Sequence, residues 1–143
     1  MYQKALLFSD PTTGALILQQ TSPKEIKAMG RLVQNFDEKT WLANRERIVE
    51  EGTYFKFKNG RPAGEDMEGK EEGEVGGLWE RLRETGEREL VEASPRDRIW
   101  GIGFGAANAG KNRERWGLNL LGKALMKVRE RMREEENVKN GGA

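Results

Sequence analysis

The sequence contains no cysteine and no histidine, and these two absences exclude most familiar catalytic chemistry. Without cysteine there is no disulfide, no thiolate nucleophile and no structural zinc site of the usual type. Without histidine, Ser-His-Asp and Cys-His catalysis and a His-based metal site are excluded as well. Catalysis would have to use carboxylates, lysine, hydroxyls or backbone dipoles. An all-oxygen magnesium site is the metal chemistry left open, but no Asp-x-Asp-type cluster outside one acidic loop favours it, so we expect no metal and no cofactor.

Long apolar runs are also missing. No stretch approaches the roughly 18 residues that a membrane-spanning helix needs, and the first residues lack the apolar core of a signal peptide. The 143 residues carry a net charge of only +1, which gives no general attraction to nucleic acid or to an anionic membrane. The sequence therefore predicts one cytoplasmic domain without a membrane partner.

Helix signals occur along most of the chain. Residues 2–8 have the character of a helix that ends before Asp10. Ser22 to Glu25 form a capping box with proline at the first helical position, and Asp37 is the expected N-cap of the next helix. Further expectations are a helix end or kink at Gly52, helix or strand at 54–57, a short helix over 78–85 closed by Gly86, a polar loop over 106–115, and a last helix from about Trp116 to Glu135.

Two short segments predict the β-structure. Residues 90–93 and 99–104 are expected to form a very small sheet, so the predicted fold class is α+β, a helix-dominated single domain with a small β-sheet. Residues 59–77 are rich in glycine and glutamate with almost nothing to bury, and we expect a mobile insertion there. The predicted domain covers residues 1–136, and residues 137–143 are expected to fray.

The most informative stretch begins at residue 89. Glu92 follows a short β-type run. Asp97 follows a turn at Ser94-Pro95 and lies just before Trp100. Glycines follow at 101, 103 and 105, and glycine allows the main chain to approach a ligand closely. Two carboxylates, an aromatic ring and a glycine-rich backbone indicate a pocket for a sugar or nucleotide. A plain turn between two packed elements has a similar pattern.

The exact sequences of several segments are more specific than this general pattern. A strand ending in LVE precedes DRIWG at 97–101, and NLLGKALMKVR follows at 119–129. In the same order the chain contains YQKALLFSD at 2–10, MGRLVQNFDEKTW at 29–41, KF at 56–57 and LRETGERELVEAS at 82–94. Together these pieces resemble the NADAR (YbiA-like) family of N-glycosidases. Relative to that family, 59–77 reads as an insertion.

The resemblance implies hydrolysis of an N-glycosidic bond between ribose C1 and an amine or base. Family members act on riboflavin-pathway ribosylamino-pyrimidine phosphates, and some remove ADP-ribose from guanine. Asp97 and Glu92 can share the stabilisation of an oxocarbenium-like centre and protonation of the leaving nitrogen. Lys4, in the family's QKA motif, is the expected nucleophile or imine partner. The expected substrate-binding residues are Trp100, Trp41, Gly101, Gly103, Asn119 and Arg31.

Two alternatives stay open beside this reading. Relative to the family, the chain is expected to lack an N-terminal part that carries an active-site glutamate, which favours an inactive, truncated paralogue that binds a nucleotide or ADP-ribose. The other alternative is an unrelated helical interaction protein with a basic C-terminal helix. The expected partner is a phosphorylated ribosyl or ADP-ribosyl small molecule, with ADP-ribosylated nucleic acid as a further candidate.

Overall fold

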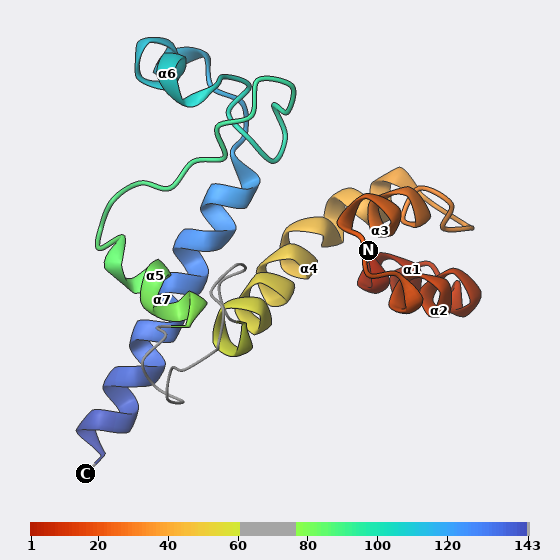
Figure 1. The fold of residues 1–143 in the computed structure, drawn as a ribbon, viewed down its shortest axis with the longest axis horizontal. Helices are drawn as coiled ribbons and strands as arrows, with labels where there is room; N and C mark the ends of the chain where they lie inside the picture. Colours follow the sequence, from red (N-terminus) through yellow and green to blue (C-terminus); the bar gives the residue numbers. More distant parts are fainter. Residues whose placement is uncertain (61–76, 143) are drawn as a thin grey trace, which may run out of the picture. The chain divides into compact units, whose positions relative to one another are not determined.

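Helices account for all regular structure in the described part of the chain. The computed structural model describes residues 1–60 and 77–142 (Figure 1). The elements are α1 (Tyr2–Leu7), α2 (Pro11–Gln19), α3 (Pro23–Met29), α4 (Glu38–Asn59), α5 (Leu78–Glu84), α6 (Ala106–Ala109), the 3₁₀ helix η1 (Gly110–Arg115) and α7 (Leu120–Gly141). Most of the expected loop at 59–77 lies outside the described residues.

The small β-sheet predicted from residues 90–93 and 99–104 is wrong, because no strand forms among the described residues. The carbonyls of five successive residues, 98–102, all accept N–H groups from residues 117–121. In a strand, successive carbonyls point to opposite sides, so only alternate residues bond to one neighbour. Pro95 and the left-handed φ of +77° at Gly103 also break an extended path. The described fold is therefore helical and not α+β.

The chain divides into two compact units, residues 1–48 and residues 49–143. In the first unit α1 lies beside α2, and α2 contacts α3 (Figure 1). Its core consists of four buried side chains, Ala5, Phe8, Ile17 and Val33. Because this core is small, hydrogen bonds between segments are expected to matter for the stability of the unit.

Asp10 provides the clearest of those links. Its carboxylate accepts the N–H of Thr13 at 3.0 Å, which caps α2, and the N–H of Gln34 at 2.8 Å, which fastens the segment after α3. These two backbone hydrogen bonds lower the pKa of Asp10, because they stabilise the carboxylate more than the neutral acid. One carboxylate therefore fixes a helix start and a distant loop.

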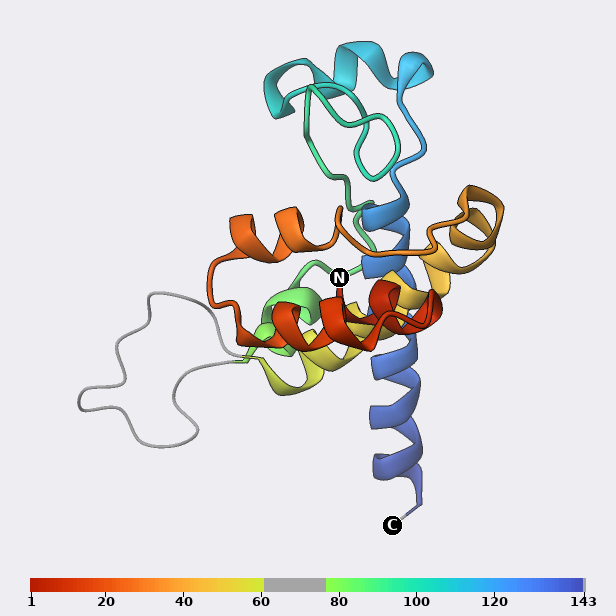
Figure 2. The ribbon, with the colours of Figure 1, turned by 90° about the vertical axis from the view of Figure 1, so that its right-hand side faces the viewer.

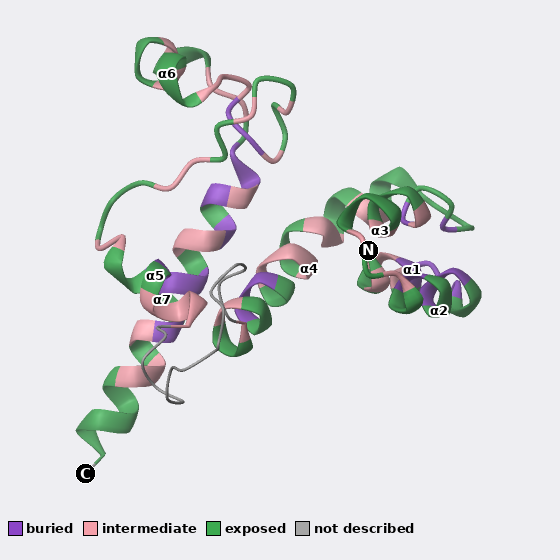
Figure 3. Ribbon diagram, in the orientation of Figure 1, coloured by how far each residue is buried: buried purple, intermediate pink, exposed green. Residues whose placement is uncertain are grey.

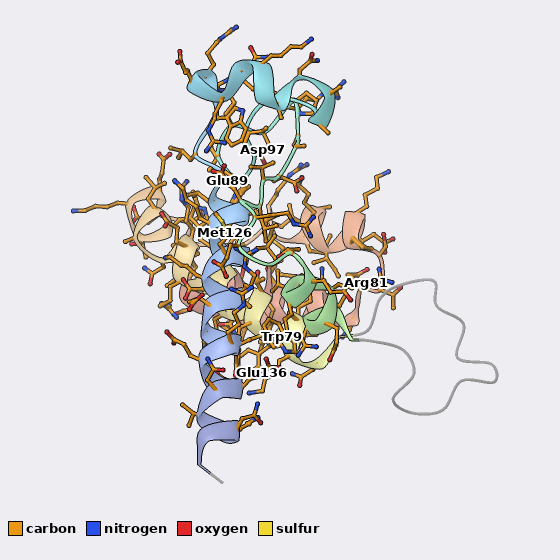
Figure 4. The ribbon with its side chains drawn as sticks, turned by 90° about the vertical axis from the view of Figure 1, so that its left-hand side faces the viewer. Trp79, Arg81, Glu89, Asp97, Met126 and Glu136 are labelled. Carbon is orange, nitrogen blue, oxygen red and sulfur yellow. The ribbon has the colours of Figure 1, made fainter. Side chains whose placement is uncertain are left out.

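The second unit is built on α7. Helix α5 packs against α7 (Figures 1 and 2), and the core between these elements and the end of α4 contains Tyr54, Leu82, Val128 and Met132. Buried residues are concentrated in the first two-thirds of α7, and its C-terminal turns are exposed (Figure 3). The indole N–H of Trp79 on α5 donates to Glu136 on α7 at 2.5 Å (Figure 4).

Several helix boundaries differ from the expectations. Asp37 is confirmed as a cap, since its carboxylate accepts the N–H of Thr40 at 2.7 Å, but the Ser22 side chain makes no capping hydrogen bond. Helix α4 continues past Gly52 to Asn59, so the predicted interruption is wrong. The expected polar loop at 106–115 is helical. Helix α7 starts at Leu120 and reaches Gly141.

No helix in residues 1–60 or 77–142 combines the length and apolar character needed to cross a membrane.

Replacing Asp10 with asparagine should destabilise the protein at pH 7 and should matter little at acidic pH. The pKa of Asp10 is lowered from 3.8 in the folded protein, so its stabilising effect is complete above the unfolded value and is lost as pH falls through the folded value. Thermal unfolding followed by circular dichroism at pH 7 and at about pH 2.5, below the usual carboxyl range, measures the difference. Glu25→Gln, at an exposed position of α3, is the control. An equal loss at both pH values for Asp10→Asn would contradict this role.

Candidate active-site residues in the two units

Lys4 occupies an unusual environment for a lysine near a chain end. Its Nζ donates a hydrogen bond to the Gly30 carbonyl at 2.8 Å and lies 4.5 Å from the ring centroid of Phe36 and 5.7 Å from that of Trp41. Burial lowers the pKa of Lys4, because the ammonium group loses water on this apolar side. A larger neutral fraction makes the amine a better nucleophile.

The other candidates of this unit differ in their relation to Lys4. Trp41 is half-buried and lies against the same amine, so these two predicted residues are brought together. Arg31 is exposed, and its neighbour Gly30 supplies the carbonyl that Lys4 contacts. Sequence reasoning missed Phe36, whose ring is closer to Lys4 than that of Trp41. Its aromatic side chain just before the Asp37 cap was the available signal.

Asp97 organises the turn that carries the second group of candidates. Its Oδ1 accepts the N–H of Ile99 at 2.9 Å and the N–H of Trp100 at 2.8 Å. A carboxylate that bonds backbone two and three residues ahead is a turn-forming arrangement that fixes both the loop and the side chain. Figure 4 shows Asp97 in this loop, beyond the start of α7. Half-buried Trp100 ends the same turn, and its backbone N–H is one of the two that Asp97 accepts.

Asn119 determines where Glu92 lies. Its side chain is only 5% exposed, with Oδ1 accepting the N–H of Glu92 at 3.0 Å and Nδ2 donating to the Leu90 carbonyl at 2.9 Å. Both polar ends of the amide are therefore engaged by backbone. The Glu92 side chain is exposed, and the Glu92 carbonyl accepts the N–H of Ile102 at 3.0 Å. Asn119 thus holds one carboxylate-bearing segment against the glycine-containing one.

Three glycines make this close packing sterically feasible. A Cβ at Gly101 would lie 2.7 Å from the Glu92 carbonyl oxygen, and one at Gly122 would lie 2.1 Å from the Leu90 oxygen and 2.4 Å from Asn119 Nδ2. Gly117 is equally crowded, at 2.2 Å from the carbonyl oxygen of Arg98. Gly101 is buried and so serves chain packing, whereas Gly103 is partly exposed.

The predicted site residues thus form two groups. Lys4, Trp41 and Arg31 belong to the first unit, and Glu92, Asp97, Trp100, Gly101, Gly103 and Asn119 belong to the second. The approach of Lys4 to Asp97 stays a prediction. Within the described ranges no group of three or more metal-ligating side chains is present.

Comparison with known proteins defines the family. The NADAR domain matches residues 1–133, which include the first unit and most of the second. The chain is 41% identical over 132 residues to an N-glycosidase of Acanthamoeba polyphaga mimivirus, covering 91% of this chain and 69% of that protein. It is 31% identical over 131 residues to an N-glycosidase of Nostoc punctiforme, covering 92% and 69%. The protein therefore belongs to the NADAR family.

A third relative, the protein irg-1 of Caenorhabditis elegans, is 35% identical over 136 residues, with 92% of this chain and 57% of that protein covered. The chain spans between 57% and 69% of the length of these relatives. Their names describe those proteins, and the activity of the present chain is treated below as a proposal.

Asn119→Ala should lower the free energy of unfolding by about 1 to 3 kcal/mol, because it leaves the part-buried N–H of Glu92 and the part-buried carbonyl of Leu90 without these partners. Gly122→Ala should have a comparable effect without changing Asn119, since its methyl group would occupy the space of that amide. Urea unfolding measures both. Asn108→Ala, an exposed change in α6, is the matched control. If Asn119→Ala were as mild as the control, Asn119 would not brace this loop.

Proposed function

We propose that this protein is an N-glycosidase that hydrolyses the C1–N bond of a ribosylamine or ADP-ribosyl substrate. The observation that carries the proposal is Lys4, an amine held against two aromatic rings, with its pKa lowered by burial, at the lysine of the family's QKA motif. Membership of the NADAR family and two relatives named N-glycosidase support the same reaction class.

The first candidate mechanism uses Lys4 as an imine partner. A ribosylamine opens to an imine at C1, and the neutral Lys4 amine adds to that carbon. The substrate nitrogen then takes up a proton and leaves with the C1–N electron pair, so that C1 is bound to Lys4 as an iminium. Water adds to C1, and collapse of the carbinolamine releases the ribose aldehyde and restores the Lys4 amine. The net change is addition of one water across the C1–N bond.

The second candidate mechanism uses carboxylates alone. Cleavage of the C1–N bond while the ribosyl ring stays closed builds positive charge at C1, which a fixed negative charge stabilises. Asp97 is suited to this part because two backbone N–H groups fix its orientation. Glu92, whose backbone is held by Asn119 and whose side chain is exposed, is the candidate donor of a proton to the leaving nitrogen.

Substrate recognition would use the aromatic residues. The flat face of a leaving heterocycle suits Trp100 or Trp41 as a stacking partner. A riboflavin-pathway ribosylamino-pyrimidine phosphate and an ADP-ribosylated guanine are the two substrates to compare, the second either free or in nucleic acid. Binding of ADP-ribose without turnover is the alternative function, that of an inactive paralogue.

Lys4→Ala and Asp97→Asn should each lower C1–N cleavage at least about 100-fold, the usual scale for a positioned nucleophile, acid or base. Release of the free base or amine from each substrate by the full chain, followed by chromatography, gives the rate. Lys27→Ala removes an exposed lysine of α3 in the same unit and should leave the rate unchanged.

Lys4→Arg separates the two mechanisms, because arginine keeps the charge but forms no imine. Near-native cleavage by Lys4→Arg would eliminate the imine route and leave the carboxylate route. Borohydride trapping of a substrate adduct on Lys4 would support the imine instead. Full activity with both Lys4 and Asp97 replaced would show that neither residue carries the reaction. Binding of ADP-ribose without cleavage of either substrate would favour the non-catalytic alternative.

A further inference from the structure

Positive charge is concentrated in the segment that follows Asp97. Residues 96–116 contain five cations, at 96, 98, 111, 113 and 115, and two carboxylates, at 97 and 114, which gives a net charge of 5 − 2 = +3. The whole chain carries +1, so the remainder carries 1 − 3 = −2. The same segment contains Trp100, Phe104 and Trp116. Its charge is therefore a local feature and not an average property of the protein.

Two of these cations gather on one ring. The guanidinium of Arg98 lies 5.9 Å from the ring centroid of Phe104, and that of Arg115 lies 5.7 Å from the same centroid. Arg98 Nη2 also donates to the Arg115 carbonyl at 2.8 Å. Within residues 1–60 and 77–142, neither guanidinium forms an ion pair, whereas Arg113 nearby is paired with Glu89 at 2.6 Å. Both guanidinium groups therefore lie within 6 Å of the same ring centroid, and this local excess of positive charge favours an anion beside them.

The backbone is shaped to hold Arg98 in this place. Gly103 has a φ of +77°, and a Cβ there would lie 2.7 Å from Arg98 Cγ, so a side chain at 103 would displace the arginine. The Arg98 carbonyl accepts the N–H of Leu118 at 2.8 Å, which fixes the main chain at the same residue. This orientation is therefore a consequence of the fold and not of one flexible surface side chain.

Space for a ligand lies beside the second arginine. A hollow of about 430 Å³ adjoins η1 and is lined by residues 110–115, including Lys111 and Arg115. Among residues 1–60 and 77–142, the hydrogen bond from the Arg115 side chain is the long one from Nη1 to Asn112 Oδ1 at 3.4 Å, so its other N–H groups can serve a ligand. A planar guanidinium with unused donors suits the oxygens of a phosphate group.

Another arginine of this unit that could bind phosphate already uses its guanidinium in hydrogen bonds within the protein. Arg129, in α7, is only 5% exposed, and its Nη1 donates to Thr85 Oγ1 at 2.6 Å and to the Arg88 carbonyl at 3.0 Å. Helix α7 offers no N-terminal anion site either, because the N–H groups of Leu120 and Leu121 donate to the carbonyls of Ile99 and Trp100. Anion binding here would depend on side chains.

We propose that Arg98 and Arg115, arranged on Phe104, bind the phosphate or diphosphate group of a small nucleotide-like ligand. The proposal deepens the proposed function and rests on it for the identity of that ligand, since both candidate substrates carry phosphate. Arg98 lies within the Asp97–Trp100 turn, so one loop would supply the phosphate contact, the carboxylate and the stacking ring.

The test is calorimetric titration of the full chain with inorganic pyrophosphate, which contains no glycosidic bond and is independent of hydrolysis. We expect saturable binding at one site, and at least a tenfold weaker affinity in Arg98→Gln/Arg115→Gln. The lysine pair Arg98→Lys/Arg115→Lys keeps the charge without the planar fork and should give an intermediate affinity. Lys123→Gln/Lys139→Gln removes the same charge from exposed positions of α7 and should bind as the native chain does.

Three results would overturn the site. They are no pyrophosphate binding by the native chain, equal weakening in the α7 control pair, and tight, strongly salt-dependent binding of a single-stranded oligonucleotide that pyrophosphate does not displace. Folding of each variant is checked by urea unfolding. If the native chain binds pyrophosphate through the arginine pair but cleaves neither substrate, the proposed N-glycosidase activity fails and the phosphate site stands.

Discussion

The buried amide of Asn119 is the contact on which the second unit's candidate site depends. It bonds the backbone at both Leu90 and Glu92, and it sits at the start of α7 with a left-handed φ of 51°. Short polar residues such as asparagine tolerate this conformation better than most others. The position therefore combines a backbone bend, a helix start and a link between segments almost thirty residues apart. Gly122, which leaves room for the amide one turn later, belongs to the same arrangement.

Several of the helices, though not α2, were predictable from the sequence because their signals are local. Asp37, the proline at the start of α3 and the apolar spacing of α7 each act within one or two turns. The sheet was not predictable in this way. Residues 99–104 have strand-like composition, but five consecutive carbonyls are used by residues 117–121, a long-range pairing that no local pattern encodes. The helix end or kink predicted at Gly52 was wrong because tertiary packing outweighs the low helix propensity of glycine. Tyr54, two residues later, packs in the core and stabilises α4 beyond Gly52.

The candidate site residues can be proposed from sequence motifs, but their contacts cannot. Asp97 and Lys4 stand out by motif, whereas the hydrogen bonds that make Asp97 a turn former and the rings that surround Lys4 appear only in three dimensions. Arginines were the hardest to interpret. Arg129 is engaged by backbone and a hydroxyl, and the pair at 98 and 115 becomes visible only through the ring of Phe104. Chemical type is a property of the sequence, but solvent exposure and partners are properties of the fold.

The pairing of residues 98–102 with residues 117–121 also has a dynamic consequence. Because the first amides of α7 donate to carbonyls of the loop, the loop cannot lift away while the helix keeps those hydrogen bonds. Amides that are exposed in one cooperative opening share the same opening free energy in hydrogen exchange. Leu120 and Leu121 therefore report on motion around Asp97 and Trp100, and slower hydrogen exchange at their amides with a ligand present would show that the loop is held more tightly.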